Sequence, residues 1–238
     1  MGFFRGFMAP FRGVIYVRRA HLWHLILLPV LLNMALAGGA VWAAARYWQQ
    51  ELAARSFAMG SPALASVLFA VATSLGAIVL FVTVQPLLGA VFNDLLSERV
   101  ERKVRGDSPR PPFFASAWRS LGHAVLKLIL YSAAFVVGLS LSAVTAGLGG
   151  AVGLGLGTLF LAYDGFDYPL SRRSVGFWAK WRYLVLHPAQ TIGYGLGATV
   201  FYLIPLALVV APPITAVGAT LVYLETESRR QKPPKKRD

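Results

Sequence analysis

The sequence has no cysteine and few acidic residues or histidines. Its 238 residues include ten Asp and Glu and four His. Without cysteine the chain has no disulfide, no thiolate metal site and no cysteine nucleophile. The histidines do not combine with a third ligand at a metal-binding spacing, and no nucleophile–base pair, phosphate-binding loop or haem motif is present. We therefore expect no enzyme, no cofactor and no metal.

Charge is scarce and apolar residues are abundant. Charged residues make up 14% of the chain and hydrophobic residues 56%, whereas soluble domains carry about 25% charged residues. The mean hydropathy is +0.59. This composition excludes a disordered chain and disfavours a soluble domain. It predicts an all-α, polytopic helical membrane protein.

The basic residues gather in clusters that flank four apolar blocks. The clusters lie at 5–19, 99–119, 172–182 and 229–237, and the blocks cover 22–48, 63–93, 121–163 and 183–224. Short cytoplasmic loops of membrane proteins collect Lys and Arg. If every cluster is cytoplasmic, the first two blocks cross the membrane out and back, and both termini are cytoplasmic.

The other two blocks must return to the side that they left. The third breaks at residues 147–150, and the fourth breaks at Pro212 and Pro213. Their second arms, which end at Tyr163 and Glu225, measure roughly 21 and 18 Å as helices, less than the roughly 30 Å of a bilayer core. We therefore predict two long transmembrane helices and two partly penetrating helical hairpins. Since backbone at such breaks needs cover, a homo-oligomer is one expectation.

The two ends of the chain differ from these blocks. Residues 1–20 predict an amphipathic interfacial helix, and residues 1–226 a single membrane domain. The apolar face of that helix comprises Phe3, Phe4, Phe7, Met8, Phe11, Val14 and Ile15. A signal peptide is the alternative, disfavoured by its long charged leader. Residues 227–238 predict a basic, disordered cytoplasmic tail drawn to anionic membrane lipid rather than to nucleic acid.

Several short segments, in chain order, resemble the CysZ sulfate permease and etoposide-induced-protein family. They are 28–33 (LPVLLN), 85–88 (QPLL), 98–101 (ERVE), 166–170 (FDYPL) with 172–173 (RR) and 175–177 (VGF), and 204–206 (IPL) with 211–212 (AP) and 217–220 (VGAT). The resemblance covers roughly residues 3–226 and is most specific in the aromatic-Asp-Tyr-Pro segment.

The resemblance implies a multi-pass protein of the bacterial cell inner membrane that admits sulfate for sulfur assimilation. It also implies a basic pair before the proline of the first span. This chain has Trp23 and His24 there, and its nearest arginine pair, Arg18 and Arg19, lies five residues earlier. Family membership alone does not fix the function, because one fold serves several roles.

Glycines near the breaks are candidate anion contacts. Gly153 and Gly155 open the short arm of the third block, where free N–H groups and the helix dipole favour an anion. The alternative is that small residues let helices pack closely in lipid. Thr215 stands in the corresponding short arm of the fourth block, where residues 193–197 repeat the glycine pattern. This echo is compatible with an internal duplication.

Polar residues inside or beside the blocks carry further hypotheses. Asn33 and Gln85 are candidates for a hydrogen bond between the two long spans. Lys127 either reaches back to the cytoplasmic interface or attracts an anion along a pathway. Arg172 and Arg173 either pair with Asp164 and Asp167 around a turn at Pro169 or gather oxyanions, which guanidinium groups fit well.

The sequence thus supports two classes of function. The first is a permease for a small oxyanion, with sulfate as the leading substrate and a candidate site comprising Arg18, Arg19, Gly153, Gly155, Arg172, Arg173 and Thr215. The second is a non-transporting membrane scaffold or lipid-interacting protein, for which the amphipathic start and the basic tail argue.

Overall fold

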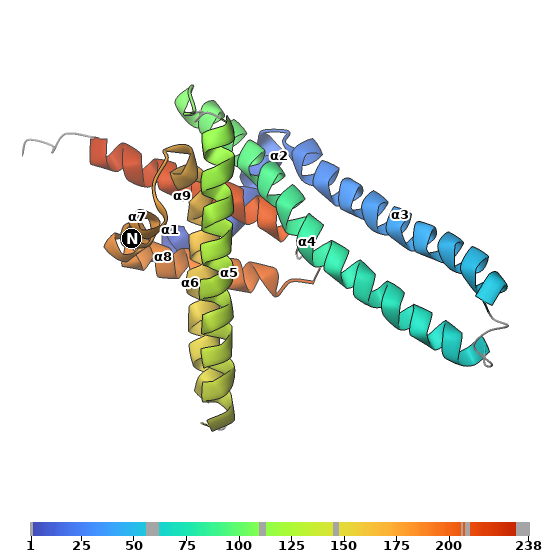
Figure 1. Ribbon diagram of the computed structural model, residues 1–238. Helices are drawn as coiled ribbons and strands as arrows, with labels where there is room; N and C mark the ends of the chain where they lie inside the picture. Colours follow the sequence, from blue (N-terminus) through green and yellow to red (C-terminus); the bar gives the residue numbers. More distant parts are fainter. Residues whose placement is uncertain are drawn as a thin grey trace, which may run out of the picture. The chain divides into compact units, whose positions relative to one another are not determined.

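A computed structural model describes residues 2–55, 62–109, 113–144, 148–205, 207 and 210–231, and these fold as α-helices without a β-strand. The chain divides into two compact units. One unit is His24–Phe92, and the other joins Met1–Trp23 to Asn93–Asp238. The helices of both units are shown in Figure 1.

The smaller unit consists of most of α3 (Trp23–Arg55) and most of α4 (Pro62–Arg105), which run back along each other (Figure 1). Within α3, residues Trp23–Ala43 form an apolar stretch with a mean hydropathy of 2.0, of which only 12% is buried by protein. A helix of this length spans a bilayer core. The side chains over most of the apolar part of α4, including Gln85, lie outside the described residues, as does that of Asn33.

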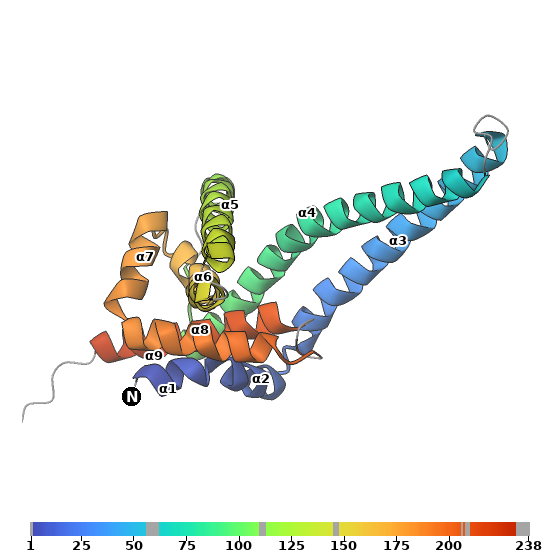
Figure 2. The same ribbon diagram turned by 90° about the horizontal axis from the view of Figure 1, so that it is seen from below.

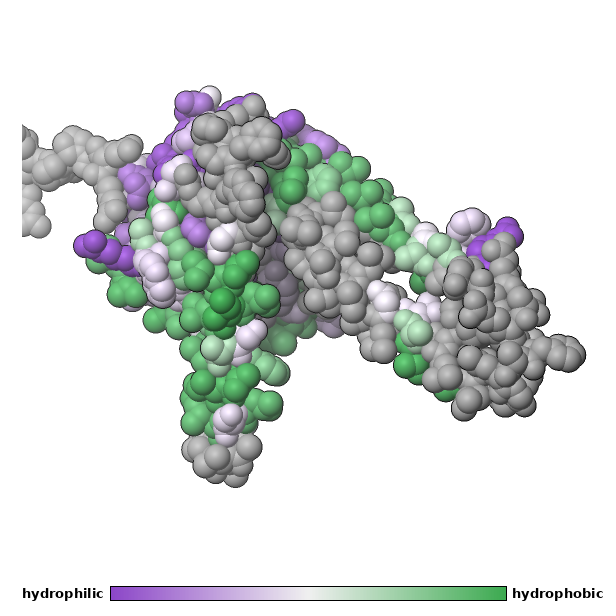
Figure 3. Space-filling view, in the orientation of Figure 1, coloured by the Kyte–Doolittle hydropathy of each residue, from purple (hydrophilic) through white to green (hydrophobic). Residues whose placement is uncertain are grey.

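The larger unit holds the second stretch of this kind. Residues Val125–Ser142 of α5 (Phe113–Val144) have a mean hydropathy of 1.9, and protein buries 6% of them. Apolar helices that the protein leaves uncovered are stable in lipid rather than in water. The protein is therefore an all-α membrane protein, as the composition predicts. Figure 3 shows the apolar surface over the far end of α5 and α6.

The third block folds as a hairpin with a longer return arm than predicted. Its second helix, α6 (Leu148–Arg172), has 25 residues and continues past Tyr163 with Pro169 inside it. The prediction of a turn at Pro169 was wrong. The chain turns at Ser174, which adopts a φ of 57°, and the Val175 N–H donates to the Leu170 carbonyl at 3.2 Å. Ion pairs to the last turns of α6 hold them in helical form.

The fourth block also differs from its prediction. It contains α7 (Phe177–Leu186), α8 (Pro188–Tyr202) and α9 (Ala211–Gln231). The break precedes Ala211, and Pro212 and Pro213 lie in the first turn of α9, where proline needs no N–H partner. Helix α9 runs through position 226 to Gln231, so residues 227–231 are helical, and 232–238 lie outside the described residues.

The amphipathic start forms two short helices, α1 (Gly2–Phe7) and α2 (Ala9–Arg19), that lie against α8 and α9 (Figure 2). Glycines make the close approach: a Cβ on Gly6 would lie 2.4 Å from the Gln190 carbonyl oxygen, and one on Gly197 would lie 2.1 Å from that of Phe7. The side chains of Phe4, Met8 and Ile15 remain exposed on the other face.

Candidate functional site

The last turns of α6 carry polar side chains on two faces. Asp164, Asp167 and Ser171 follow one another at helical spacing and bond to α5 and α7. Tyr168 and Arg172 bond to the end of α4 instead. Helix α6 therefore joins two ionic clusters, one on each side.

The first, the lysine–aspartate cluster, comprises Lys127, Asp164, Asp167 and Lys180. The Lys127 ammonium lies 3.0 Å from Asp164 Oδ1 and 2.5 Å from Asp167 Oδ2. Lys180, whose side chain is 1% exposed, pairs with Asp167 Oδ1 and donates to Ser171 Oγ at 2.6 Å. One carboxylate, that of Asp167, thus ties α6 to both α5 and α7.

The electrostatics of this cluster favour an ionised Asp167. Burial by itself raises the pKa of this carboxyl, but the ammonium groups of Lys127 and Lys180 outweigh it and lower the pKa to about 2. Asp167 lies beyond the apolar block that ends at Tyr163. Opposite charges within hydrogen-bond distance favour the charged form of a carboxyl group, so Asp167 is ionised at neutral pH.

The second, the arginine–glutamate cluster, comprises Arg172, Arg173, Asp94 and Glu101. The Arg172 guanidinium lies 2.6 Å from Asp94 Oδ1 and 3.2 Å from Glu101 Oε2, and it donates to Ser97 Oγ at 2.6 Å. Arg173 pairs with the other oxygen of Glu101. The Glu101 side chain is fully buried, so the two arginines neutralise a carboxylate that has no access to water.

These clusters correct the predicted pairing of charges. Asp164 and Asp167 bind lysines of α5 and α7 rather than Arg172 and Arg173, which bind carboxylates of α4. Each cluster contains two cationic and two anionic side chains. Neither therefore carries the surplus positive charge that an oxyanion needs, and either arginine must first leave its carboxylate to bind one.

Lys127 is paired in the described conformation. Its side chain is 22% exposed and ends between two aspartates, so it does not stand as an unpaired charge, and its reach to the cytoplasmic interface stays a prediction. Lys180, Glu101 and Asp94 were missed as partners. Their one signal in the sequence is that they stand just outside the apolar blocks, where the helices begin and end.

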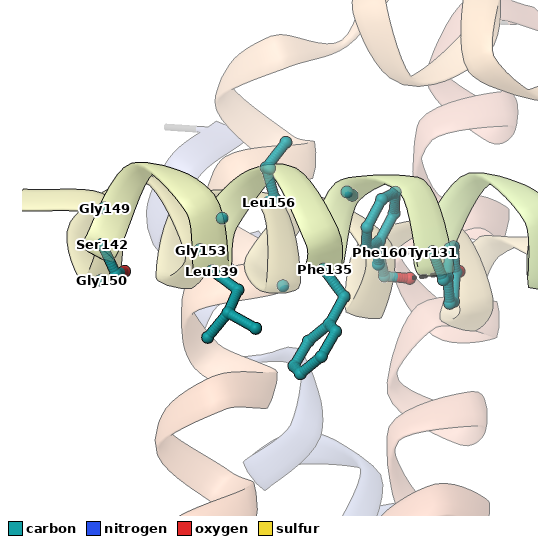
Figure 4. Close-up of a pocket in the computed structure, with 12 residues that line it drawn as sticks. Tyr131, Phe135, Leu139, Ser142, Gly149, Gly150, Gly153, Leu156 and Phe160 are labelled. Carbon is teal, nitrogen blue, oxygen red and sulfur yellow. Dashed lines mark hydrogen bonds between the residues drawn. The ribbon is translucent and has the colours of Figure 1, made fainter. Parts of the chain in front are cut away.

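Of the two glycine candidates, Gly153 lines a groove between α5 and α6, and Gly155 is not among the lining residues. The groove has a volume of about 350 Å³ and is lined mainly by apolar and small residues, including Tyr131, Phe135, Gly138, Leu139, Gly153 and Phe160 (Figure 4). A Cβ on Gly149 would lie 2.1 Å from the backbone nitrogen of Ser142, so Gly149 allows the two helices to pack closely, whereas a Cβ on Gly153 would meet nothing within 4 Å.

The position of Gly153 and Gly155 in α6 limits their chemistry. Because α6 begins at Leu148, both residues follow the first four positions, whose N–H groups lack acceptors within a helix. The free N–H groups expected for an anion are therefore not theirs in this conformation. Gly155 is exposed and its surroundings would accept a Cβ.

Thr215 is buried in the first turn of α9. Its hydroxyl bonds to the carbonyl oxygens of Ala211 at 2.8 Å and Pro212 at 3.0 Å, and its own carbonyl accepts the Tyr194 hydroxyl at 2.8 Å. These bonds hold the start of α9 against α8. The hydroxyl thus serves the helix start in the described conformation.

Arg18 and Arg19 are the exposed arginines of the candidate set. They end α2, and neither has an ion-pair partner among the residues that the structure describes. The helix stops there because His21 adopts a φ of 55°, which lets the Leu22 N–H donate to the Val17 carbonyl at 3.1 Å. The Lys103 ammonium donates to the Ala20 carbonyl at 2.8 Å, so several cations meet at this helix end.

Comparison with known proteins places the chain in a family. A family model described as Sulfate transporter CysZ/Etoposide-induced protein 2.4 matches residues 9–213. A "Sulfate transporter CysZ" of Pectobacterium atrosepticum is 28% identical over 84% of this chain and 77% of its own length. A protein of that name from Pseudomonas aeruginosa is 29% identical over 63% of this chain and 64% of its own length. The chain belongs to the sulfate transporter CysZ/etoposide-induced protein family.

Proposed function

We propose that the protein is a membrane permease for a small oxyanion, with sulfate as its first substrate, in a bacterial inner membrane. The family match over residues 9–213, together with relatives that bear the name of a sulfate transporter, carries this proposal. The uncovered apolar helices α3 and α5 support it, because they suit a protein embedded in lipid. Both termini are proposed to be cytoplasmic, in keeping with the basic clusters.

A permease must replace the water around its anion with hydrogen-bond donors. Guanidinium groups suit this task, since their planar fork of N–H donors matches the oxygens of a tetrahedral oxyanion. Arg172 and Arg173 are already bound to the buried carboxylate of Glu101, and Arg172 also to that of the half-exposed Asp94. Arg18 and Arg19 are exposed and have no such partner among the described residues, so we assign them the first contact with the anion.

In this proposal the two ionic clusters position the helices. The lysine–aspartate cluster fixes α7 and α5 on α6, and the arginine–glutamate cluster fixes the end of α4 on α6. Gly149 allows the close packing of the hairpin, and Thr215 holds the start of α9. Arg172 or Arg173 reaches the anion only in a state in which Glu101 is released.

Radiolabelled sulfate uptake into proteoliposomes tests the proposal. The wild-type protein should exceed empty vesicles under at least one imposed gradient, and the double variant R18Q/R19Q should lose about tenfold in uptake, the equivalent of one lost charge-assisted hydrogen bond. R99Q, which removes an exposed arginine of α4, is the matched control. Wild-type uptake equal to that of empty vesicles under every gradient refutes the permease.

A lipid-interacting scaffold is the second candidate, because the exposed fractions of Phe4 and Met8 are 74% and 51%. Deleting the N-terminal helices is a poor test, since their glycine faces belong to the packed interior of the unit. The double variant F4S/M8S changes only the exposed face. A scaffold should lose its membrane phenotype in this variant, whereas a permease should keep most of its flux.

A further inference from the structure

We propose that the protein binds a phosphate-type anion in a second polar pocket, at the end of the unit where α1 and α8 begin and α9 ends. The pocket has a volume of about 320 Å³ and is lined by Gly2, Arg5, His187, Gln190, Val222, Glu225, Thr226 and Arg229. Figure 2 shows these helices side by side, with the start of α1 at the same end as the start of α8.

Each helix presents one face to this pocket. The lining residues are spaced by three or four along α1, α8 and α9, the spacing at which side chains share a helix face. Helix α1 lies against the start of α8 at Gly2, where a Cβ would be in ordinary contact, 3.9 Å from the backbone nitrogen of Gln190. The pocket is therefore built by the fold and does not depend on one loop.

The charges of the pocket favour an anion. Arg5 is half-buried, Arg229 is exposed, and neither has an ion-pair partner among the described residues. The one carboxylate in the lining, Glu225, pairs with Arg12, which lies outside the lining. Arg12 thus balances the negative charge of Glu225. The two arginines of the lining therefore give the pocket a net positive charge.

Two sets of hydrogen-bond donors that lack acceptors also favour an anion as the ligand. The Thr226 hydroxyl donates to Gln190 Oε1 at 2.9 Å, while Gln190 Nε2 is buried without a hydrogen-bond partner among the described residues. Buried polar groups normally have partners, and an anion would supply one. In addition, α8 starts with His187 as its N-cap and has no side-chain cap. Pro188 has no N–H and the Thr191 N–H donates to the His187 carbonyl, so the N–H groups available at this helix start are those of Ala189 and Gln190.

The same chemistry has two natural sources, an anionic lipid headgroup or a free oxyanion. Native mass spectrometry of the full-length protein in detergent counts retained lipid after doping with phosphatidylglycerol or phosphatidylcholine. Thermal unfolding in lipid-free detergent, with and without inorganic phosphate, reports a free anion. The test variant is R5Q/R229Q, and R99Q is the control for loss of surface charge.

A preference of the wild type for phosphatidylglycerol that falls about tenfold in R5Q/R229Q, but not in R99Q, assigns the pocket to a lipid headgroup. Stabilisation by phosphate that disappears in R5Q/R229Q, without a lipid preference, assigns it to a free anion. If R5Q/R229Q equals the wild type in both measurements, or the wild type shows neither effect, the proposal is overturned. Neither readout uses sulfate transport, so this outcome is independent of the permease.

Discussion

The Lys180 ammonium lies buried on the carboxylate of Asp167 and ties α7 to α6. The same carboxylate accepts Lys127 from α5 through its other oxygen at 2.5 Å. Asp167 therefore connects α6 to both α5 and α7, and the sequence separates it from its two lysine partners by 40 and 13 positions. Removing the Asp167 carboxylate and removing the Lys180 ammonium should therefore destabilise the protein to different extents.

Replacing Lys180 with methionine should destabilise the protein by about 3–5 kcal/mol, because breaking a buried ion pair leaves a charge without its partner. The effect is measured by thermal or denaturant unfolding in detergent. The double variant K180M/D167N should be less destabilised than the sum of the single variants, since it removes the uncompensated charge. Strict additivity would show that the two side chains do not interact.

The control for this cycle is Lys103→Met. Lys103 is exposed, and the hydrogen bond that it donates among the described residues goes to the Ala20 carbonyl at 2.8 Å, so its loss should cost less than about 1 kcal/mol. If K103M lowered the free energy of unfolding as much as K180M, the destabilisation of K180M could not be attributed to the burial of its ion pair.

The pH dependence of stability should reveal the low pKa of Asp167. Its folded pKa of about 2 lies below the unfolded value of about 3.9. A lowered carboxyl pKa contributes stability that is complete above the unfolded value and is lost as the pH falls through the folded value. Between about pH 4 and 2, the wild type should lose more stability than D167N.

This comparison is made by unfolding the two proteins in the same detergent across that range. D167N carries no titrating group at the position, so the difference between the two curves isolates Asp167 from the other carboxylates. Parallel curves would show that the lysines do not hold this carboxyl in its ionised form.

A methyl group on Gly197 should detach α1 from α8. The Cβ would lie 2.1 Å from the Phe7 carbonyl oxygen, which is backbone and cannot turn aside. We expect G197A to lower the free energy of unfolding by about 1–3 kcal/mol, as overpacking does in a well-packed interior. Hydrogen exchange of residues 2–19 should rise at the same time.

Gly157→Ala is the matched control. This glycine is also helical, and a Cβ there would meet nothing within 4 Å, so the change should be neutral or stabilising by up to about 1 kcal/mol. Equal protection of residues 2–19 in G197A and G157A would contradict the glycine-mediated docking of α1.

Replacing His21 with glycine should stabilise the end of α2. His21 has a φ of 55°, which costs a residue with a Cβ roughly 1–2 kcal/mol and costs glycine nothing. Part of this gain is offset by the greater freedom of glycine in the unfolded chain, so we expect a net gain below about 1 kcal/mol. A net loss in H21G would show that the imidazole itself holds the turn.

Composition predicted the class of this protein correctly, because the solvent around a helix dictates its content of apolar and charged residues. A long helix with few charges, such as Trp23–Ala43, is stable only where lipid covers it. The apolar outer face of residues 3–15 could also be predicted from the sequence, since it depends on helical periodicity alone. The family resemblance was based on short segments that occur along the chain in the same order as in the family, and the family match confirms it.

The partners of the charged residues could not be predicted from the sequence in the same way. Asp164 and Arg172 stand eight positions apart, and proximity suggested that they pair. They lie on different faces of α6, and each finds its partner on another helix. The glycines of α8 posed the same problem, because the pattern shows small residues but not the backbone that lies against them.

The sequence alone thus determined that the protein is helical, lies in a membrane and belongs to this family, because lengths, hydropathy and segment order are properties of the chain itself. The tertiary structure decided which cations remain available to an anion. A buried arginine beside a carboxylate is neutralised, whereas Arg18 and Arg19 end a helix at the surface, and only the packing of distant helices separates these two cases.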